Sequence, residues 1–353
     1  LFQRETEKIL KWQFLSVTEM TVPISPVHTS NTGKCQKFRS LLPLFQRETE
    51  KILKWQFLSV IVEEILTPSQ TRYDNDCEIF KKCGGCSFRH ISYNAELEIK
   101  NNFVKDAFKR IGKLDVESEA ILGCDNINYY RNKAQYPVAE IDGKVVCGFY
   151  SKRSHRVVSF TACKLHPQVF EDIVNFVMDK VNKSNIKAYN EENHTGLLRH
   201  IYIRQAFHTK EIMVCFVVTD WSDSFKIIAE ELMKNFSDIK SVVINKNSKK
   251  TNVIMGDECR ILAGSETITD IMCGNKIELS PLSFYQVNTE QAEKLYAIGN
   301  EYADLKGNEE VLDLYCGAGT IGLSFADKAK KIIGVEIIPQ AIENANKNAK
   351  INN

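Results

Sequence analysis

The sequence lacks a hydrophobic run long enough to cross a membrane. Its longest clearly apolar stretch spans only 212–218, whereas a membrane-spanning helix needs about 20 residues. It also lacks a basic segment followed by an apolar segment and a cleavage site, so no secretory signal is expected. We therefore predict a cytoplasmic protein that does not bind membranes. The first residue is Leu rather than Met, and we expect the sequence to be a fragment.

The sequence also lacks an excess of charge of one sign. It has 46 Lys and Arg against 45 Asp and Glu, so a surface for nucleic acid would have to be a local patch. Residues 77–163 hold 14 basic and 10 acidic residues, a modest local excess. A length of 353 residues with 43% hydrophobic content allows two or three globular domains. We expect a monomer.

Histidine is scarce and shows no spacing typical of a metal site or a catalytic triad. Five of the seven histidines lie between His155 and His208, and we interpret them as surface or capping groups. Cysteine, in contrast, is abundant, with eleven residues. In a chain without secretory features, this number favours metal binding or catalysis over disulfides.

The first 17 residues recur unchanged at 44–60. True repeat proteins diverge between copies and need about three or more units to bury a core. We therefore interpret the duplication as a rearrangement or an assembly artefact rather than a functional repeat. Val60–Leu66 is rich in β-prone residues and predicts a strand.

A glycine-rich loop lies near the end of the sequence, in EVLDLYCGAGTIG at 310–322. The pattern predicts a strand, a turn with Gly317 and Gly319, and a helix over 321–326. A second strand at 331–335 ends on Glu336, 23 residues after Asp313, where an acid typically binds ribose hydroxyls. Asp313 would repel a pyrophosphate but suits the ammonium and sulfonium of S-adenosylmethionine. A dinucleotide site and a purely structural turn stay open as alternatives.

Three cysteines stand close together in CEIFKKCGGCSFRH, namely Cys77, Cys83 and Cys86. Two glycines let the backbone fold the last two thiolates toward one centre. Cys163 is the most plausible fourth ligand. The spacing suits an iron-sulfur cluster, which tolerates three close cysteines and one distant one. Structural zinc and unrelated buried thiols remain alternatives.

The residues that follow predict an α+β region. We expect one helix at 91–113 and then a β meander with its hairpin turn at Asp142 and Gly143. Basic and aromatic residues alternate along the meander, which suits phosphates and unstacked bases, although an ordinary solvated sheet face would look the same. The basic residues are Arg131, Lys133, Lys152, Arg153 and Arg156, and the aromatic ones are Tyr129, Tyr130, Tyr136 and Tyr150.

Strands and helices then alternate toward the glycine loop. Apolar patterning predicts helices at 168–181, 224–236 and 289–302, and strands at 200–207, 211–218 and 241–245. Gln286 lies in SFYQVN just before the last of these helices. Its side chain could reach a cofactor or simply serve helix entry.

Six segments in one order resemble the RNA uracil-5-methyltransferase family, from about residue 62 to 353. The chain looks most similar to the iron-sulfur 23S rRNA members from bacteria. The segments are CEIFKKCGGCSFRH, YRNKAQYPV, GFYSKRSH with Cys163 after it, GLLRHIYIR, SFYQVN and VLDLYCGAGTIGL.

The resemblance implies S-adenosylmethionine at Gln286, Tyr315 and Glu336, and a [4Fe-4S] cluster on Cys77, Cys83, Cys86 and Cys163. It implies RNA as the partner, with rRNA favoured over tRNA. Family members attack C6 of uridine with a cysteine thiolate, methylate C5 and remove the C5 proton with a carboxylate.

The expected fold is α/β, a Rossmann-like class I methyltransferase domain that is truncated, preceded by an α+β central domain and an iron-sulfur segment. We expect boundaries at 1–76, with the last strand of a lost TRAM domain, 77–123, 124–284 and 285–353. The family's DPPR stretch, nucleophilic cysteine and glutamate base are absent, so the sequence as given is expected to be inactive. Cys316 belongs to the cofactor loop and is not a candidate nucleophile. A non-catalytic iron-sulfur RNA-binding module and a nicotinamide-dependent oxidoreductase are the competing functions.

Overall fold

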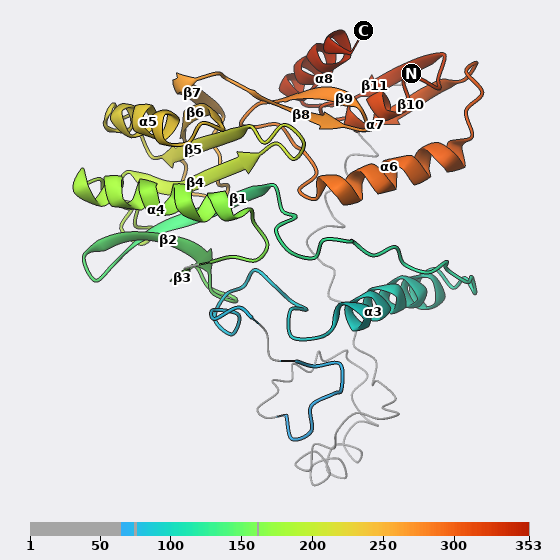
Figure 1. Ribbon diagram of the computed structural model, residues 1–353, viewed down its shortest axis with the longest axis horizontal. Helices are drawn as coiled ribbons and strands as arrows, with labels where there is room; N and C mark the ends of the chain where they lie inside the picture. Colours follow the sequence, from blue (N-terminus) through green and yellow to red (C-terminus); the bar gives the residue numbers. More distant parts are fainter. Residues whose placement is uncertain (1–64, 74–75, 161, 353) are drawn as a thin grey trace, which may run out of the picture. The chain divides into compact units, whose positions relative to one another are not determined.

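The computed structural model describes residues 65–73, 76–160 and 162–352 (Figure 1). Its contacts divide the chain into two units, Leu1–Asp74 with His90–Ala95, and Asn75–Arg89 with Glu96–Asn353. In the first unit, Arg72 and Ile91 form an antiparallel bridge. The duplicated segment and residues 60–64 of the strand predicted at Val60–Leu66 lie outside the described residues.

A seven-stranded sheet forms the centre of the second unit, in the order β3-β2-β1-β4-β5-β6-β7. Only β5 and β6 pair in parallel within it. The predicted meander is confirmed as β1 to β3, and its turn residues Asp142 and Gly143 both have positive φ, as a two-residue hairpin turn requires. The strands are β1 Lys133–Ile141, β2 Lys144–Tyr150, β3 Val157–Ser159, β4 Leu198–Gln205, β5 Ile212–Val218, β6 Ile239–Lys246 and β7 Glu258–Gly264.

Both faces of this sheet are covered by apolar side chains. On one face, Ile203, Val214 and Phe216 join a cluster with the apolar sides of α4 (Gln168–Lys183) and α5 (Ser224–Asn235). On the other face, Tyr202 and Met213 belong to a second cluster. Alternate residues of β4 and β5 therefore serve two separate cores, which explains why β5 is a continuous apolar run.

The second cluster is completed by elements that lead toward the glycine loop. The hairpin of β8 (Ile268–Met272) and β9 (Asn275–Leu279) contributes to it, as do Tyr285 and the start of α6 (Thr289–Ala303). The helix predicted at 289–302 is confirmed, whereas β7, β8 and β9 were not predicted. This second cluster connects the central sheet to the segment that carries Gln286.

The last part of the chain contains the predicted strand, loop and helix. β10 (Glu310–Leu314) runs parallel to β11 (Lys331–Val335) as a separate two-stranded sheet, and α7 (Thr320–Ser324) follows the glycine loop. These predictions are confirmed. α8 (Pro339–Ile351) was not predicted and packs against β9.

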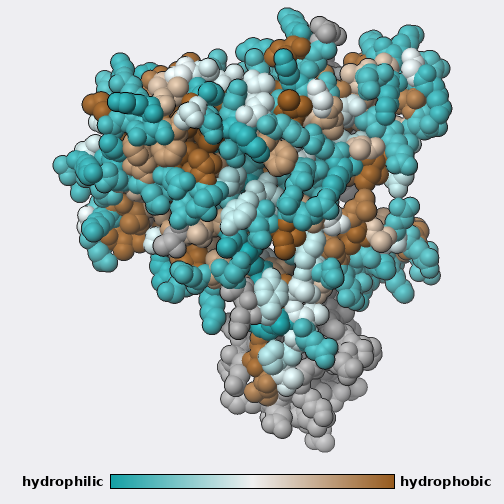
Figure 2. Space-filling model, in the orientation of Figure 1, coloured by the Kyte–Doolittle hydropathy of each residue, from teal (hydrophilic) through white to brown (hydrophobic). Residues whose placement is uncertain are grey.

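The helix expected at 91–113 is shorter than predicted. α3 (Tyr93–Asp106) gives way to a π-helical turn at Ala107–Ile111, and Ile111 is 80% exposed. No described helix has the length and apolar character needed to cross a bilayer. The face seen in Figure 2 is largely hydrophilic, with apolar patches between the polar side chains.

Candidate functional site

The loop between β10 and α7 has a backbone that favours glycine. Tyr315, Gly317 and Gly319 all have positive φ, at 63°, 54° and 81°. Glycine adopts this conformation without a steric cost, whereas Tyr315 does so with strain. Gly319 precedes the first turn of α7. The loop therefore turns sharply after the strand, and Tyr315 at its start is 59% exposed.

Asp313 lies near the end of β10. The sequence pattern predicts that it contacts a cofactor. Its Oδ2 accepts a hydrogen bond of 2.9 Å from the backbone N–H of Gly322 in α7. Burial raises the pKa of Asp313, and this hydrogen bond opposes the shift. Asp313 thus ties the strand to the helix and fixes the loop between them.

Glu336 lies at the carboxyl end of β11, next to the glycine loop. The N–H groups of Ile337 and Ile338 donate to its Oε1, at 2.8 and 2.9 Å, and Gly317 donates to its Oε2 at 3.1 Å. The bond from Ile338 is the largest cause that lowers the pKa of Glu336. The carboxylate is therefore a well-held anion against the loop, where Oε2 has an acceptor site left for a ribose hydroxyl.

The segment that carries Gln286 is held by buried polar side chains of the central sheet. Arg204 is 1% exposed and donates to the carbonyl oxygens of Ser280 and Ser283, at 3.2 and 2.6 Å. The amide of Asn132 donates to the carbonyl oxygen of Gln286 at 2.9 Å. Helix entry itself is served by another residue, because Asn288 accepts the N–H of Gln291.

Three asparagines that were not predicted, two within α8 and one at its C-terminal cap, hold this helix in place. Their spacing of four residues along one helix face is the signal that could have revealed them. Asn348 is completely buried. Their partners are Ser283 Oγ for Asn344 (3.0 Å), Ala318 O and Glu278 N for Asn348 (3.0 and 2.8 Å), and Lys276 O and N for Asn352 (2.7 and 2.8 Å).

Cys316 lies in the loop but is turned into the protein. It is 8% exposed, and a Cβ on Gly334 of β11 would meet its sulfur at 2.9 Å. Burial raises the pKa of the Cys316 thiol, and the nearby Asp313 and Glu336 raise it further. A buried neutral thiol is a packing group rather than a nucleophile.

The structure brings the four predicted cluster cysteines into one region. Burial raises the pKa of Cys86 to about 11, and the neighbouring Cys163, Cys83 and Cys77 raise it as well. Cys83 pairs with Ser151 in an isolated antiparallel bridge. The four thiols are therefore close enough for a charge on one to affect another.

Two local contacts orient these cysteines. The N–H of Gly85 donates to the sulfur of Cys83 at 3.3 Å, and the sulfur of Cys163 lies 3.3 Å from Nδ1 of His166. Within the described residues, no group of three His, Cys, Asp or Glu side chains has a geometry that could hold a metal ion. The donor set suits iron or zinc chemically, but the thiols are not arranged as ligands.

The basic and aromatic residues of the meander separate into surface and core. Tyr136 is completely buried and stacks with Phe160, with ring centroids 5.2 Å apart, so it belongs to the core. Burial lowers the pKa of Lys133 to about 8, with Arg204 and Arg131 adding to the shift. Tyr150 and Arg156 line an open hollow at the end of the sheet.

A sequence model of the tRNA (uracil-5-)-methyltransferase family matches residues 92–353. A protein described as an uncharacterized RNA methyltransferase from Clostridium tetani is 43% identical over 290 residues, which cover 82% of this chain and 63% of that protein. One from Bacillus cereus is 44% identical over 289 residues, with 81% and 63% covered. The chain thus spans less than two thirds of the length of these relatives.

Among solved structures, the chain resembles a tRNA (uracil-54, C5)-methyltransferase from Pyrococcus abyssi in complex with S-adenosyl-L-homocysteine. The TM-score is 0.65 at 24% identity, with 82% of this chain and 65% of the other covered. At this identity the likeness concerns the α/β fold. The family match covers most of the chain, and with the two bacterial relatives it shows that the chain belongs to the tRNA (uracil-5-)-methyltransferase family.

Proposed function

We propose that this chain binds S-adenosylmethionine and RNA as part of an enzyme that methylates C5 of uridine. Family membership supports the reaction. The observation that carries the proposal is the position of Glu336, whose carboxylate is held beside Gly317 at the carboxyl ends of two parallel strands. This position favours a nucleoside cofactor, and membership of a methyltransferase family favours S-adenosylmethionine over a dinucleotide.

The residues of the loop fit this cofactor. Glu336 would hold the ribose, the backbone at Gly317 and Gly319 allows close approach, and Tyr315 and Gln286 would contact the rest of the molecule. Asp313 contributes by fixing the loop through Gly322. S-adenosylmethionine bound there would supply an electrophilic methyl group.

The uridine itself must be activated by protein groups. Its C5 becomes nucleophilic when a thiolate adds to C6, and a base must then remove the C5 proton. We assign neither role to a described residue, since Cys316 is buried with a raised pKa. On this proposal, residues 65–352 supply binding and orientation, and the sequence printed here does not transfer the methyl group by itself.

Cofactor binding can be tested by isothermal titration calorimetry with S-adenosylmethionine. Glu336→Gln should weaken binding about tenfold or more, because it removes the charge that accepts the hydroxyl bond. Glu343→Gln is the matched control, an exposed glutamate on α8 whose Oε2 accepts a hydrogen bond from Nε2 of Gln340 at 3.0 Å. Equal affinities for the two variants would contradict the proposed role of Glu336, and tight NADH binding without S-adenosylmethionine binding would favour an oxidoreductase.

We also propose that Cys77, Cys83, Cys86 and Cys163 hold a [4Fe-4S] cluster. The support is the four-thiol donor set gathered in one region and the sequence spacing. Metal binding would rearrange the thiols, which must be deprotonated to act as ligands. Anaerobically purified protein should be brown and contain about four iron and four sulfide per chain. One zinc per chain without sulfide would contradict the cluster.

The preferred RNA is proposed to be rRNA, on the likeness of the cysteine motif to the iron-sulfur 23S rRNA members. Unmodified 23S rRNA fragments should then bind at least about tenfold more tightly than unmodified tRNA, measured at one fixed salt concentration. Tighter binding of tRNA would contradict this preference. RNA binding without any affinity for S-adenosylmethionine would instead favour a non-catalytic RNA-binding module.

A further inference from the structure

We propose that the hollow at the end of the central sheet binds one unstacked nucleotide of the RNA, with its base inside and its phosphates at the rim. This inference rests on the proposed RNA binding. The site is formed by residues other than those of the glycine loop and the cysteine region, and it would hold the RNA at a point additional to the methylated uridine.

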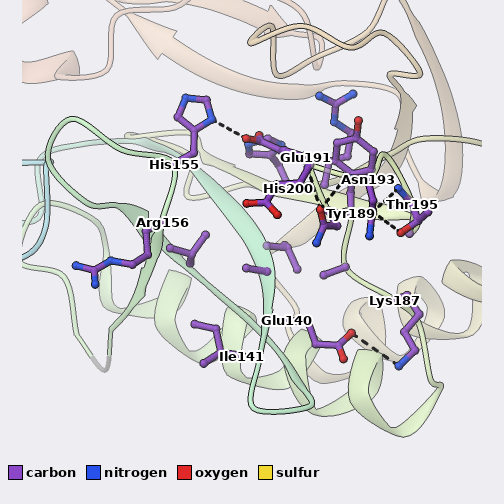
Figure 3. A pocket seen from close by; sticks show the side chains of 18 of the residues that line it. Glu140, Ile141, His155, Arg156, Lys187, Tyr189, Glu191, Asn193, Thr195 and His200 are labelled. Carbon is purple, nitrogen blue, oxygen red and sulfur yellow. Dashed lines mark hydrogen bonds and ion pairs between the residues drawn. The ribbon is translucent and has the colours of Figure 1, made fainter.

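The hollow has a volume of about 990 Å³ and opens to solvent. This is at the upper end of the range for small-molecule sites, about 300–1,000 Å³. Three segments line it, namely 138–143 at the end of β1, 150–157 between β2 and β3, and 187–200 leading into β4. Figure 3 shows side chains from these segments around one space. The hollow is therefore large enough for a nucleotide.

Flat aromatic and cationic groups stand in two of these segments. The rings of Tyr150 and His155 are stacked, with centroids 4.8 Å apart and planes 20° from parallel. The guanidinium of Arg199 lies 4.6 Å from the ring centroid of Tyr189. Unpaired bases bind proteins chiefly by stacking on such rings and guanidinium planes. The half-exposed His155 and the partly exposed rings of Tyr150 and Tyr189 therefore offer surfaces for a base.

Polar groups beside the rings can bind the edge of a base. Glu191 lies against the Tyr150 and His155 pair. Its Oε2 is 2.6 Å from Nδ1 of His155 (Figure 3), and its Oε1 accepts a hydrogen bond from the hydroxyl of Tyr150 at 3.4 Å. A carboxylate accepts hydrogen bonds from the amino and imino groups of bases. It also repels phosphate, so it favours the base at this position.

Two buried nitrogens that line the hollow lack partners. His200 and Arg199 are each 5% exposed, and among the described residues neither Nδ1 of His200 nor Nε of Arg199 has a hydrogen-bond partner. Buried polar atoms are normally paired, so each exception calls for an explanation. The three other bonds of Arg199, to backbone carbonyls at 2.8–3.2 Å, hold its guanidinium in place. Pairing of either nitrogen with a bound base requires its side chain to move toward the hollow.

The charges around the hollow place the phosphates outside. Arg156 and Lys187 line it, and Lys187 lies 3.7 Å from Glu140 in an exposed ion pair. The lining holds three acidic residues, Glu140, Glu191 and Glu192, and three basic ones, Arg156, Lys187 and Arg199. The interior is therefore not strongly positive. A basic peptide is the other class of ligand that carboxylates would attract, but the stacked rings favour a base.

The test is binding of a fluorescein-labelled 12-nucleotide single-stranded RNA to the full chain, measured by anisotropy. His155→Ala should weaken binding about tenfold, because one stacking surface is lost. His155→Phe keeps a ring and should bind within about twofold of the unchanged protein. His155 is half exposed, so both variants should fold, which thermal melting checks. His208→Ala, an exposed histidine paired with Glu293, is the control and should bind normally.

Salt dependence separates the base from the phosphates. Arg156→Ala should lower the slope of log affinity against log salt by about one, whereas His155→Ala should leave it unchanged. Unchanged affinity in His155→Ala would overturn the proposal, and so would binding of an oligolysine peptide that the RNA does not displace.

If the unchanged protein binds neither RNA nor S-adenosylmethionine, the proposed function fails as well. If it binds both and the variants behave normally, only the nucleotide site fails.

Discussion

Strands β4 and β5 of the central sheet and strands β10 and β11 of the glycine-loop region are all rich in apolar residues, but only the first pair is buried. Every residue of β5 is buried, whereas Leu312 and Leu314 of β10 are 57% and 55% exposed. β4 and β5 each have strand neighbours on both sides and an apolar cluster on both faces. Among the described residues, β10 pairs only with β11. Apolar composition makes a strand, and its neighbours decide whether it is buried.

The two regions are consequently held together by different forces. The central sheet depends on burial of apolar area, which contributes about 25 cal/mol per Å². The glycine-loop region depends on individual hydrogen bonds, such as Asp313 with Gly322, Gly317 with Glu336, and Asn348 with Ala318. Each such bond contributes only about 1 kcal/mol net. Parallel strands are usually covered on both faces, so β10 and β11 should open far more readily than β4 and β5.

Native-state hydrogen exchange should show the largest difference between the regions. Amides of β4 and β5 should exchange only on global unfolding, which for a domain costs about 5–15 kcal/mol. Amides in 311–335 should exchange through local opening and be several kcal/mol less protected. Mass spectrometry of deuterated peptides measures both in one experiment. Slow exchange throughout 311–335 would contradict the comparison.

A matched pair of substitutions should show the same contrast in stability. Ile203→Ala removes a completely buried side chain and should lower the free energy of unfolding by about 2–5 kcal/mol. Ile333→Ala in β11, where the side chain is 37% exposed, should cost about 1 kcal/mol or less. Urea denaturation followed by circular dichroism measures both. Equal losses would mean that the two regions are packed alike.

Much of the secondary structure could be predicted because it depends on local patterns. The two-residue turn at Asp142 and Gly143 and the apolar run of β5 each determine their element within a few residues. The strands β7, β8 and β9 were missed because their sequences alternate without strong apolar character, and their pairing partners are what makes them strands. The helix predicted to reach Lys113 ends as α-helix at Asp106, and its apolar residues are largely exposed.

The candidate site could be predicted only where a backbone pattern marks it. The glycines and Glu336 follow a spacing set by the strand, turn and helix geometry. The groups that hold the site, such as Arg204 with the carbonyls of Ser280 and Ser283, are paired across 76 and 79 residues of sequence. The hollow lined by His200 could not be predicted for the same reason, because its three segments are distant in the sequence and meet only in the folded sheet. The histidine was interpreted from its sequence as a surface or capping group, but it is 5% exposed.

The buried His200 should give the central region a pH dependence. Burial lowers its pKa from 6.5 to about 4, with Arg199 and His155 adding to the shift and Glu191 opposing it. Between about pH 4 and pH 6.5, His200 is protonated in the unfolded chain but not in the folded one. Stability is therefore complete above about pH 6.5 and falls by up to about 3 kcal/mol as the pH drops to 4. In thermal melts between pH 7 and pH 4, the melting temperature of His200→Asn should fall less than that of His208→Asn. Equal falls would contradict this.

A further expected effect concerns the hydrogen bonds that join the two regions through α8. Asn348→Ala leaves the carbonyl of Ala318 and the N–H of Glu278 without their side-chain partner, which should cost about 1–3 kcal/mol. Because Ala318 lies in the glycine loop, the affinity for S-adenosylmethionine should fall together with the stability of 310–352. Asn346→Ala, an exposed asparagine on the same helix, is the control. If Asn348→Ala changes neither urea denaturation nor cofactor titration relative to Asn346→Ala, the loop is held by its own turns, and α8 contributes nothing to it.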